Sequence, residues 1–148
     1  MRLNKEKEGG LDDQSISDAL KTFFRRDRFA EFVGIELLDA GDGRARAELR
    51  LKGHHRNGIG LIQGGVIFTL ADLAFAAAVH SRGQIAVAIH CSIAYLKAAK
   101  GDLLQAEAEE VSCGPRIAVY TVRITEASGE VISRFEGMAY RKKERWNP

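Results

Sequence analysis

The chain of 148 residues contains only two cysteines, two prolines and one tryptophan. Two cysteines cannot build a disulfide framework, and Cys91 and Cys113 do not have the spacing of zinc ligands. The four histidines add no recognisable metal-binding pattern. The sequence therefore predicts a protein of a reducing compartment, with no metal site and no disulfide-stabilised scaffold.

An excess of one charge sign is also missing, since 22 Lys and Arg residues face 20 Asp and Glu residues. A net charge of +2 is too small to indicate nucleic-acid binding, and no basic stretch is interleaved with aromatic residues. We therefore expect a protein that does not bind nucleic acid.

Long hydrophobic runs are absent as well. The longest apolar stretch, Val66–Val79, covers 14 residues and contains Thr69 and Asp72. A membrane-spanning helix needs about 20 apolar residues, so this stretch predicts a buried helix and no membrane association. The N-terminal sequence MRLNKEKEGGLDDQ lacks the apolar core of a secretory signal. We therefore expect a cytoplasmic protein.

The chain length fits one domain, which buries roughly 68–70% of the surface that the unfolded chain exposes. Residues 1–14 are polar and charged and are expected to form a mobile N-terminal arm. Residues 15–141 carry the periodic pattern of a single domain, and residues 142–148 are expected to form a charged C-terminal tail.

The first part of the domain predicts a helix. Apolar residues recur at helical spacing from residue 15 onward, with Ser15 or Ser17 as the expected N-cap. We expect this helix to break near Arg28 and to end near Gly34, where a glycine is typical of a helix C-terminus.

The rest of the domain predicts one long helix and a sheet. Strict alternation indicates a strand over residues 44–51, paired in a hairpin with residues 35–39. A helix over residues 64–81 is apolar on nearly all sides and must be buried. Four further strands are predicted over residues 85–96, 103–112, 116–126 and 130–141. Consecutive strands favour an antiparallel sheet, so the predicted fold class is α+β, with one antiparallel curved sheet wrapped around one long central helix.

Gly64 and Gly65 begin the long helix. The first N–H groups of a helix have no partner within it, and together with the helix dipole they can stabilise a developing oxyanion. Glycine also lets an acyl group approach the backbone closely. The alternative explanation is that the two glycines only permit tight packing of helix against sheet.

Asp72 lies among Leu70, Ala71, Leu73 and Ala74 on this apolar helix. An unpaired carboxylate there costs several kcal/mol, which indicates either a structural partner on a neighbouring strand or a catalytic role. Asp72 follows Gly65 by seven residues, or about 10 Å along the axis. That separation is too long for one chain to use both, so catalysis predicts an antiparallel pair of helices in a dimer with two shared sites.

The run NGIGLIQGGVIFTLADLAFAAAV, which begins at Asn57, resembles the active-site segment of hotdog-fold acyl-CoA thioesterases. It is most similar to the phenylacetic-acid-degradation thioesterase subfamily, whose pattern is Asn-Gly, then His-Gly-Gly, then Leu-Ala-Asp on the central helix. The spacing is identical, and the similarity runs from about residue 29 to residue 141. The resemblance implies the hotdog fold, in agreement with the predicted order of elements.

The resemblance also implies catalytic roles. The backbone N–H of Gly64, with Gly65 beside it, polarises the thioester carbonyl. Asp72 of the partner chain acts as general base on water or as nucleophile, and Asn57 orients water or thioester. Asn-Gly is by itself an ordinary turn dipeptide, so only the resemblance gives Asn57 this function.

Two positions depart from the family pattern. Gln63 stands where the family has histidine; its amide can donate a hydrogen bond but does not titrate. Ala88 stands where some relatives carry a hydroxyl that helps to place the water. We predict that Gln63 belongs to the catalytic set and that Ala88 lines the substrate.

Three further residues are predicted to contact substrate. His90 is expected to share a strand face with Ala88, and it either lines the pocket or is an ordinary core histidine. Phe75 lies on the same broad helix face as Asp72. Arg116, after Gly114-Pro115, either contacts a CoA phosphate or is a solvated charge. We do not expect His54, His55 or Tyr95 to contact substrate. The two histidines are expected to lie on the surface of a loop, and Tyr95 is expected to belong to the core.

The resemblance implies an acyl-CoA thioesterase that hydrolyses a small aryl- or medium-chain acyl-CoA to free acid and CoA. It implies no cofactor, since coenzyme A is part of the substrate, and a homodimer that assembles further into a homotetramer. The alternative function is a non-catalytic acyl-CoA-binding protein, in which Gln63 and Ala88 mark lost chemistry.

Overall fold

Helix α1 (Asp13–Phe24) is the first element of the computed structural model, which describes residues 12–148. Most of the predicted N-terminal arm therefore lies outside the described residues. The predicted N-cap is wrong: Asp12 caps α1 by accepting the N–H of Ser15 at 2.7 Å. Ser17 is instead buried, and its hydroxyl accepts the N–H of Ala40 at 3.2 Å.

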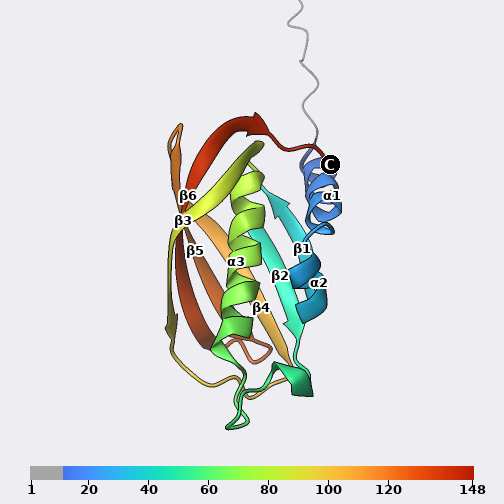
Figure 1. The fold of residues 1–148 in the computed structure, drawn as a ribbon, viewed down its shortest axis with the longest axis vertical. Helices are drawn as coiled ribbons and strands as arrows, with labels where there is room; N and C mark the ends of the chain where they lie inside the picture. The colour runs from blue at the N-terminus through green and yellow to red at the C-terminus, as the bar shows by residue number, and fades with distance from the viewer. Residues whose placement is uncertain (1–11) are drawn as a thin grey trace, which may run out of the picture.

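Helix α2 (Arg28–Val33) follows after a break, as predicted. The Asp27 carboxylate caps it by accepting the N–H of Ala30 at 2.9 Å. The helix ends at Gly34, whose φ of 96° lies in the left-handed region that favours glycine. The two helices lie on one side of the molecule beside β1 (Figure 1).

Within residues 12–148, six strands form one antiparallel sheet in the order β1-β2-β4-β5-β6-β3. They are β1 (Ile35–Gly41), β2 (Arg44–Arg50), β3 (Gln84–Tyr95), β4 (Leu103–Cys113), β5 (Ile117–Glu126) and β6 (Val131–Arg145). The sheet curves around α3 (Gly64–His80), which lies along its inner face (Figure 1). The predicted α+β fold, a curved antiparallel sheet around one long helix, is confirmed.

The core forms where α3 meets the sheet. Helix residues such as Leu70 and Ala74 are fully buried and pack against buried strand residues such as Ile124. Gly137 on β6 makes one close contact possible, because a Cβ at this position would lie 2.8 Å from the ring of Phe75. No helix among residues 12–148 is long and apolar enough to cross a membrane.

The C-terminal segment differs from the prediction. Strand β6 continues to Arg145, and its end pairs with the beginning of β3 through Gln84 and Arg145. Trp146 then packs against the ring of Phe23, and its indole N–H donates to the carbonyl of His80 at 2.5 Å. Residues 142–145 are charged and all exposed, yet they continue the strand, because backbone pairing with β3 does not require buried side chains.

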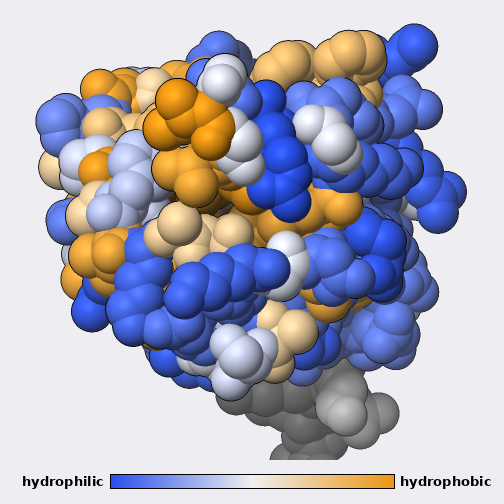
Figure 2. Space-filling model, turned by 90° about the horizontal axis from the view of Figure 1, so that it is seen from below, coloured by the Kyte–Doolittle hydropathy of each residue, from blue (hydrophilic) through white to orange (hydrophobic). Residues whose placement is uncertain are grey.

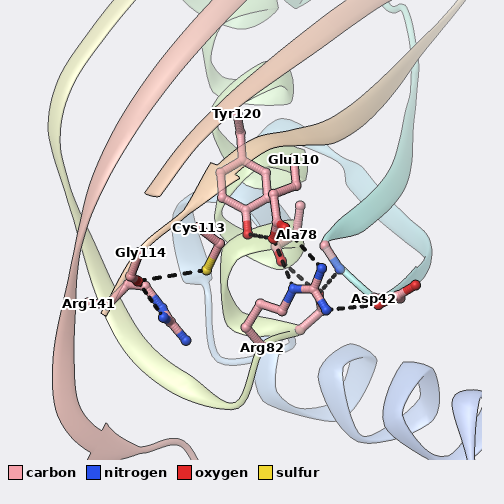
Figure 3. A network of polar contacts seen from close by, with 10 residues as sticks. Asp42, Ala78, Arg82, Glu110, Cys113, Gly114, Tyr120 and Arg141 are labelled. Carbon is pink, nitrogen blue, oxygen red and sulfur yellow. Dashed lines mark hydrogen bonds and ion pairs between the residues drawn. The ribbon is translucent and has the colours of Figure 1, made fainter. Parts of the chain in front are cut away.

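A polar network joins the turn between β1 and β2 to the far end of α3 (Figure 3). Arg82 donates to both oxygens of Glu110, at 2.8 and 3.0 Å, and to Asp42 at 2.8 Å. The buried Tyr120 hydroxyl donates to Glu110 at 2.8 Å. The Arg82 guanidinium, helped by Tyr120, holds the pKa of the Glu110 carboxyl below its usual range.

Replacing Glu110 by Gln should therefore destabilise the fold by roughly 1–3 kcal/mol at neutral pH. Because the pKa of Glu110 is lowered in the folded protein, its stabilisation is complete at neutral pH and is lost as the pH falls through that lowered pKa. The stability difference between Glu110→Gln and wild type should therefore be smaller in acid than at neutral pH. Urea unfolding at neutral and at acidic pH measures it. Glu109→Gln is the matched control, because its ion pair with Arg44 is exposed. An equal loss in both variants would contradict the prediction.

Candidate active site

The loop before α3 is held together by Asn57. Its Oδ1 accepts the N–H groups of Ile59 and Leu61, each at 3.1 Å, and its backbone N–H donates to the carbonyl of Leu61 at 2.7 Å. The side-chain NH2 of Asn57 makes no hydrogen bond with a residue in the described range. Asn57 therefore shapes the loop with its oxygen and leaves its NH2 free to donate.

His55 anchors this loop, and the prediction that it is loop surface is wrong. The side chain is 3% exposed. Its Nδ1 accepts the N–H of Lys52 at 2.9 Å and its Nε2 donates to the carbonyl of Val33, at the end of α2, at 2.7 Å. The His55 carbonyl accepts the N–H of Gln63 at 2.9 Å. His55 thus connects α2 to the residue that precedes α3.

Gln63 is the N-cap of α3. Its Oε1 accepts the N–H of Gly65, so that N–H is already occupied. The N–H of Gly64 makes no hydrogen bond with any residue from 12 to 148. Gly64 is therefore the free backbone donor at this helix N-terminus, as the oxyanion role requires.

Tyr95, at the end of β3, packs against Gly64. Its hydroxyl donates to the Gly64 carbonyl at 2.9 Å, and a Cβ on Gly64 would lie 3.0 Å from the tyrosine ring. Tyr95 is 52% exposed, so the prediction that it belongs to the core is wrong. Gly64 therefore has both properties considered for it: it packs closely against the sheet, and its N–H is free to bind an oxyanion.

A cavity of about 340 Å³ opens beside this helix N-terminus. Asn57, Gly64, Tyr95 and Lys97 are among its lining residues. Seen from this end, the surface shows apolar side chains among hydrophilic ones (Figure 2). The exposed large apolar residues of the two segments that meet here are Ile59, Leu61, Tyr95 and Leu96.

Asp72 lies half-buried in the middle of α3. Its carboxylate forms no hydrogen bond or ion pair within residues 12–148, so the structural partner considered as an alternative is not found there. Burial, with the negative charge of Asp27 as a second cause, raises the pKa of the Asp72 carboxyl. A half-buried carboxylate with a raised pKa and no partner has the properties of a functional group.

Asp72 lines a second cavity, of about 110 Å³, between α3 and β3. Phe75 and Ala88, two residues predicted to contact substrate, line it with Asp72. The remaining lining residues are Ala76, Val79, His80, Ala86, Val87 and Ala139. This cavity is apolar apart from Asp72 and His80.

His90 does not face this cavity, because β3 contains a bulge. Ala88 pairs with the buried Ala139, whereas His90 pairs with Met138 on the opposite face of the sheet. The predicted shared face of Ala88 and His90 is therefore wrong. Cys91 returns to the inner face instead, and burial together with the charge of Asp72 raises the pKa of its thiol. Strict alternation in the sequence carries no signal for the extra residue of a bulge.

Arg116 lies far along the fold from the glycines. It precedes β5, and its guanidinium donates to the carbonyl of Arg141 at 3.3 Å, beside the beginning of β3. Gly64 lies at the other end of α3, next to the end of β3. One chain therefore does not bring Arg116 to Gly64 and Asn57.

Comparison with known proteins identifies the family. The sequence profile of the thioesterase superfamily matches residues 59–133, which cover α3, β3, β4, β5 and the beginning of β6. The chain is 38% identical to an Archaeoglobus fulgidus protein named as a candidate esterase, over 91% of this chain and 88% of that protein. The chain belongs to the thioesterase superfamily.

Individual relatives identify the subfamily within this superfamily. It is 32% identical to the acyl-coenzyme A thioesterase PaaI of Escherichia coli, over 80% of this chain and 85% of PaaI. The PaaI structure, from the phenylacetic acid degradation operon, superposes with a TM-score of 0.82 over 86% of this chain and 94% of that chain, at 29% identity. A Streptococcus pneumoniae thioesterase solved with coenzyme A superposes with a TM-score of 0.78, at 28% identity, over 84% of this chain and 98% of that chain. The hotdog fold and the PaaI-like subfamily are confirmed.

Three residues predicted to be catalytic are divided between the two cavities. Asn57 and Gly64 line one cavity, and Asp72 lines the other. The two cavities have no lining residue in common. Among the described residues, no group of three or more His, Cys, Asp or Glu side chains is arranged to hold a metal ion.

Proposed function

We propose that this thioesterase hydrolyses acyl-CoA to a free acid and CoA, with Asp72 and Gly64 as the central groups. The observation that carries the proposal is the half-buried Asp72 carboxylate, which has no partner among residues 12–148 and lies on the helix whose first N–H is also unpaired within that range. The activity named for PaaI supports the choice of acyl-CoA. A cytoplasmic location is part of the proposal, as expected from the sequence.

The proposed reaction needs one base and one oxyanion donor. As general base, Asp72 takes a proton from water while the water oxygen attacks the thioester carbonyl carbon. The carbonyl oxygen becomes an oxyanion and accepts the N–H of Gly64. The C–S bond then breaks, and the CoA thiolate receives the proton from Asp72. In the nucleophilic alternative Asp72 attacks the carbonyl itself, and water hydrolyses the resulting anhydride.

Two chains complete each site in this proposal. Gly64 and Asp72 are about 12 Å apart along the helix axis and line separate cavities. Strand β3 is an edge of the sheet, with Val87 44% and Ile89 52% exposed. A second copy paired antiparallel along this edge would continue the sheet and bring Asp72 of one chain to Gly64 of the other. The homotetramer is then a pair of such dimers.

The substrate would lie across both cavities. The larger one, beside Asn57 and Tyr95, suits the pantetheine arm of CoA, and the one beside Asp72 suits the acyl group. The walls contributed by Phe75 and Val79 are apolar and leave about 110 Å³. This supports a small aryl or a medium-chain acyl group over a long chain.

A non-catalytic acyl-CoA-binding protein is the second candidate. It is favoured by the side chain of Gln63, whose oxygen is engaged in capping the helix, and by Ala88, which has no hydroxyl to hold water. Thiol release from a panel of aryl- and alkyl-CoA esters separates the two candidates. Release that depends on Asp72 supports hydrolysis, whereas saturable binding without release supports the alternative.

Replacing Gln63 by Ala should lower both stability and rate. The cap bond to Gly65 is lost, which costs about 0.5–2 kcal/mol of unfolding free energy, and loss of a positioned donor costs about 1–3 kcal/mol of transition-state stabilisation. Urea unfolding and the kcat for the best substrate of the panel measure the two effects.

Gln63→His is the matched variant for this position. It should retain activity and add an inflection near neutral pH, because imidazole titrates there and an amide does not. The wild-type rate profile should show no inflection from residue 63. Wild-type turnover in Gln63→Ala would mean that this side chain caps the helix and has no part in catalysis.

A further inference from the structure

The cavity that Asp72 lines, of about 110 Å³, extends along α3 to His80 and is called here the Asp72 cavity. Asp72 and His80 are eight positions apart, or about 12 Å along the helix axis. His80 is the last residue of α3, and its Nε2 accepts the N–H of Ala86, at the beginning of β3, at 3.4 Å. An acyl group whose carbonyl lies beside Asp72 and whose chain follows this cavity therefore ends at the His80 ring.

The His80 ring is held in one orientation. Its Nδ1 donates to the carbonyl of Ala76 at 2.7 Å, which leaves Nε2 of the neutral ring to accept from Ala86. Burial lowers the pKa of His80, so the ring stays neutral at neutral pH. The indole N–H of Trp146 fixes the backbone at the same residue by donating to the His80 carbonyl. A buried, neutral ring with both nitrogens engaged is a suitable end wall for an apolar chain.

Phe24, the last residue of α1, packs against the His80 ring. The two ring centroids are 5.6 Å apart and the ring planes are nearly perpendicular, at 89°, which is a favourable edge-to-face arrangement. Phe24 lines a different cavity, of about 730 Å³, whose lining mixes charged residues with apolar ones such as Leu37 and Leu73. This α1–β1 cavity shares no lining residue with the Asp72 cavity. Where Phe24 meets His80, two rings in contact therefore separate the two cavities.

Two further aromatic side chains hold these rings in place. The ring centroid of Phe23 lies 5.5 Å from that of His80 and 5.3 Å from that of Phe24. Trp146, which follows β6, lies 5.6 Å from Phe23 in the same measure. The four rings come from α1, α3 and the segment after β6, so they form one packed cluster in which a single ring does not turn freely.

We propose that Phe24 and His80 form a partition that sets the upper length of the acyl group. This specificity role deepens the proposed hydrolysis of acyl-CoA and rests on it. A short chain fits between Asp72 and His80, whereas a longer chain meets the His80 ring, which cannot turn aside while Phe24 packs against it. Phe24 acts through His80 and is therefore a positioning residue. Loss of its ring would open space toward the α1–β1 cavity, and apolar voids bind apolar groups.

The test is the Phe24→Ala variant, assayed with straight-chain esters from butanoyl-CoA to dodecanoyl-CoA. The KM for the longest esters should fall about tenfold, the gain expected from burying about two further methylene groups. The kcat for the shortest esters should change little, because Phe24 lines neither the Asp72 cavity nor the one beside Gly64. Phe24→Leu is the milder variant in case loss of the whole ring disturbs folding, and it should shift the preference in the same direction.

Ile16→Ala is the matched control, because Ile16 lies on the same helix and packs against the core but lines neither the Asp72 cavity nor the α1–β1 cavity. It should loosen α1 and leave the order of preference among the esters unchanged. An equal change in Ile16→Ala, or an unchanged preference in folded Phe24→Ala and Phe24→Leu proteins, would overturn the partition.

Binding without turnover separates this proposal from the proposed function. Calorimetry with the same esters on Asp72→Asn, with and without Phe24→Ala, reports which chain lengths fit. The added Phe24→Ala change should tighten binding of the longest esters about tenfold. That result without turnover by wild type would overturn the hydrolytic role and retain the partition. Turnover by wild type, with every ester bound equally by the two Asp72→Asn proteins, would overturn the partition and retain hydrolysis.

Discussion

Asp72→Asn is expected to lower kcat by roughly two to four orders of magnitude, the range that general bases supply. The amide keeps the size of the side chain but cannot accept the proton of water. The KM should change little, because Asp72 acts on the attacking water rather than on the CoA part. The measurement is thiol release under saturating substrate, with circular dichroism to show that the variant is folded.

The free energy of unfolding of Asp72→Asn should not fall along with its kcat. A carboxyl whose pKa is raised in the folded state destabilises the fold above its unfolded pKa, and this penalty disappears as the pH falls below both values. Asp72→Asn should therefore be at least as stable as wild type at neutral pH, with the advantage vanishing in acid. If the Asp72 carboxylate instead stabilised the fold, Asp72→Asn would be less stable than wild type at neutral pH. Near-normal turnover in a folded Asp72→Asn protein would contradict the catalytic role.

Mixing two inactive variants is expected to restore activity. In a heterodimer of Asp72→Ala and Gly64→Val chains, one site combines the intact Asp72 of one chain with the intact Gly64 of the other. The second site then carries both defects. Random exchange makes half of the dimers heterodimers, so about a quarter of wild-type activity should return. The rate is measured after subunit exchange, with light scattering to report dimer or tetramer mass.

Gly64→Val can disturb folding, because a Cβ on Gly64 would lie 3.0 Å from the ring of Tyr95. A second pair of variants, with a smaller change at position 57, therefore accompanies this experiment. Asn57→Asp keeps an oxygen that can accept from Ile59 and Leu61 and replaces the free NH2 by a charged carboxylate oxygen that cannot donate. It should complement Asp72→Ala in the same way. A chain that carries both changes should remain inactive with either partner variant. If folded chains exchange and no activity returns, the site is not shared.

Local periodicity in the sequence predicted most of the fold. The alternation of residues 44–51 and the all-round apolar character of α3 were enough to place a hairpin, a buried helix and a long antiparallel sheet. The helix break near Arg28 and its end at Gly34 were also confirmed. These features depend on residues close in the chain, where the spacing of side chains and the backbone preference of glycine act directly.

The sequence by itself also selected Asp72, because a carboxylate on an apolar helix is costly wherever that helix packs. Only the tertiary structure decided what surrounds it. Pairing of β3 with β6 creates the bulge that turns His90 away and brings Cys91 inward, and the packing of α2 against α3 brings Asp27 and Leu73 to one cavity. Burial of His55 and the contact of Tyr95 with Gly64 likewise join distant segments. Register, bulges and such contacts follow from the energy of the whole packed chain, so no local pattern encodes them.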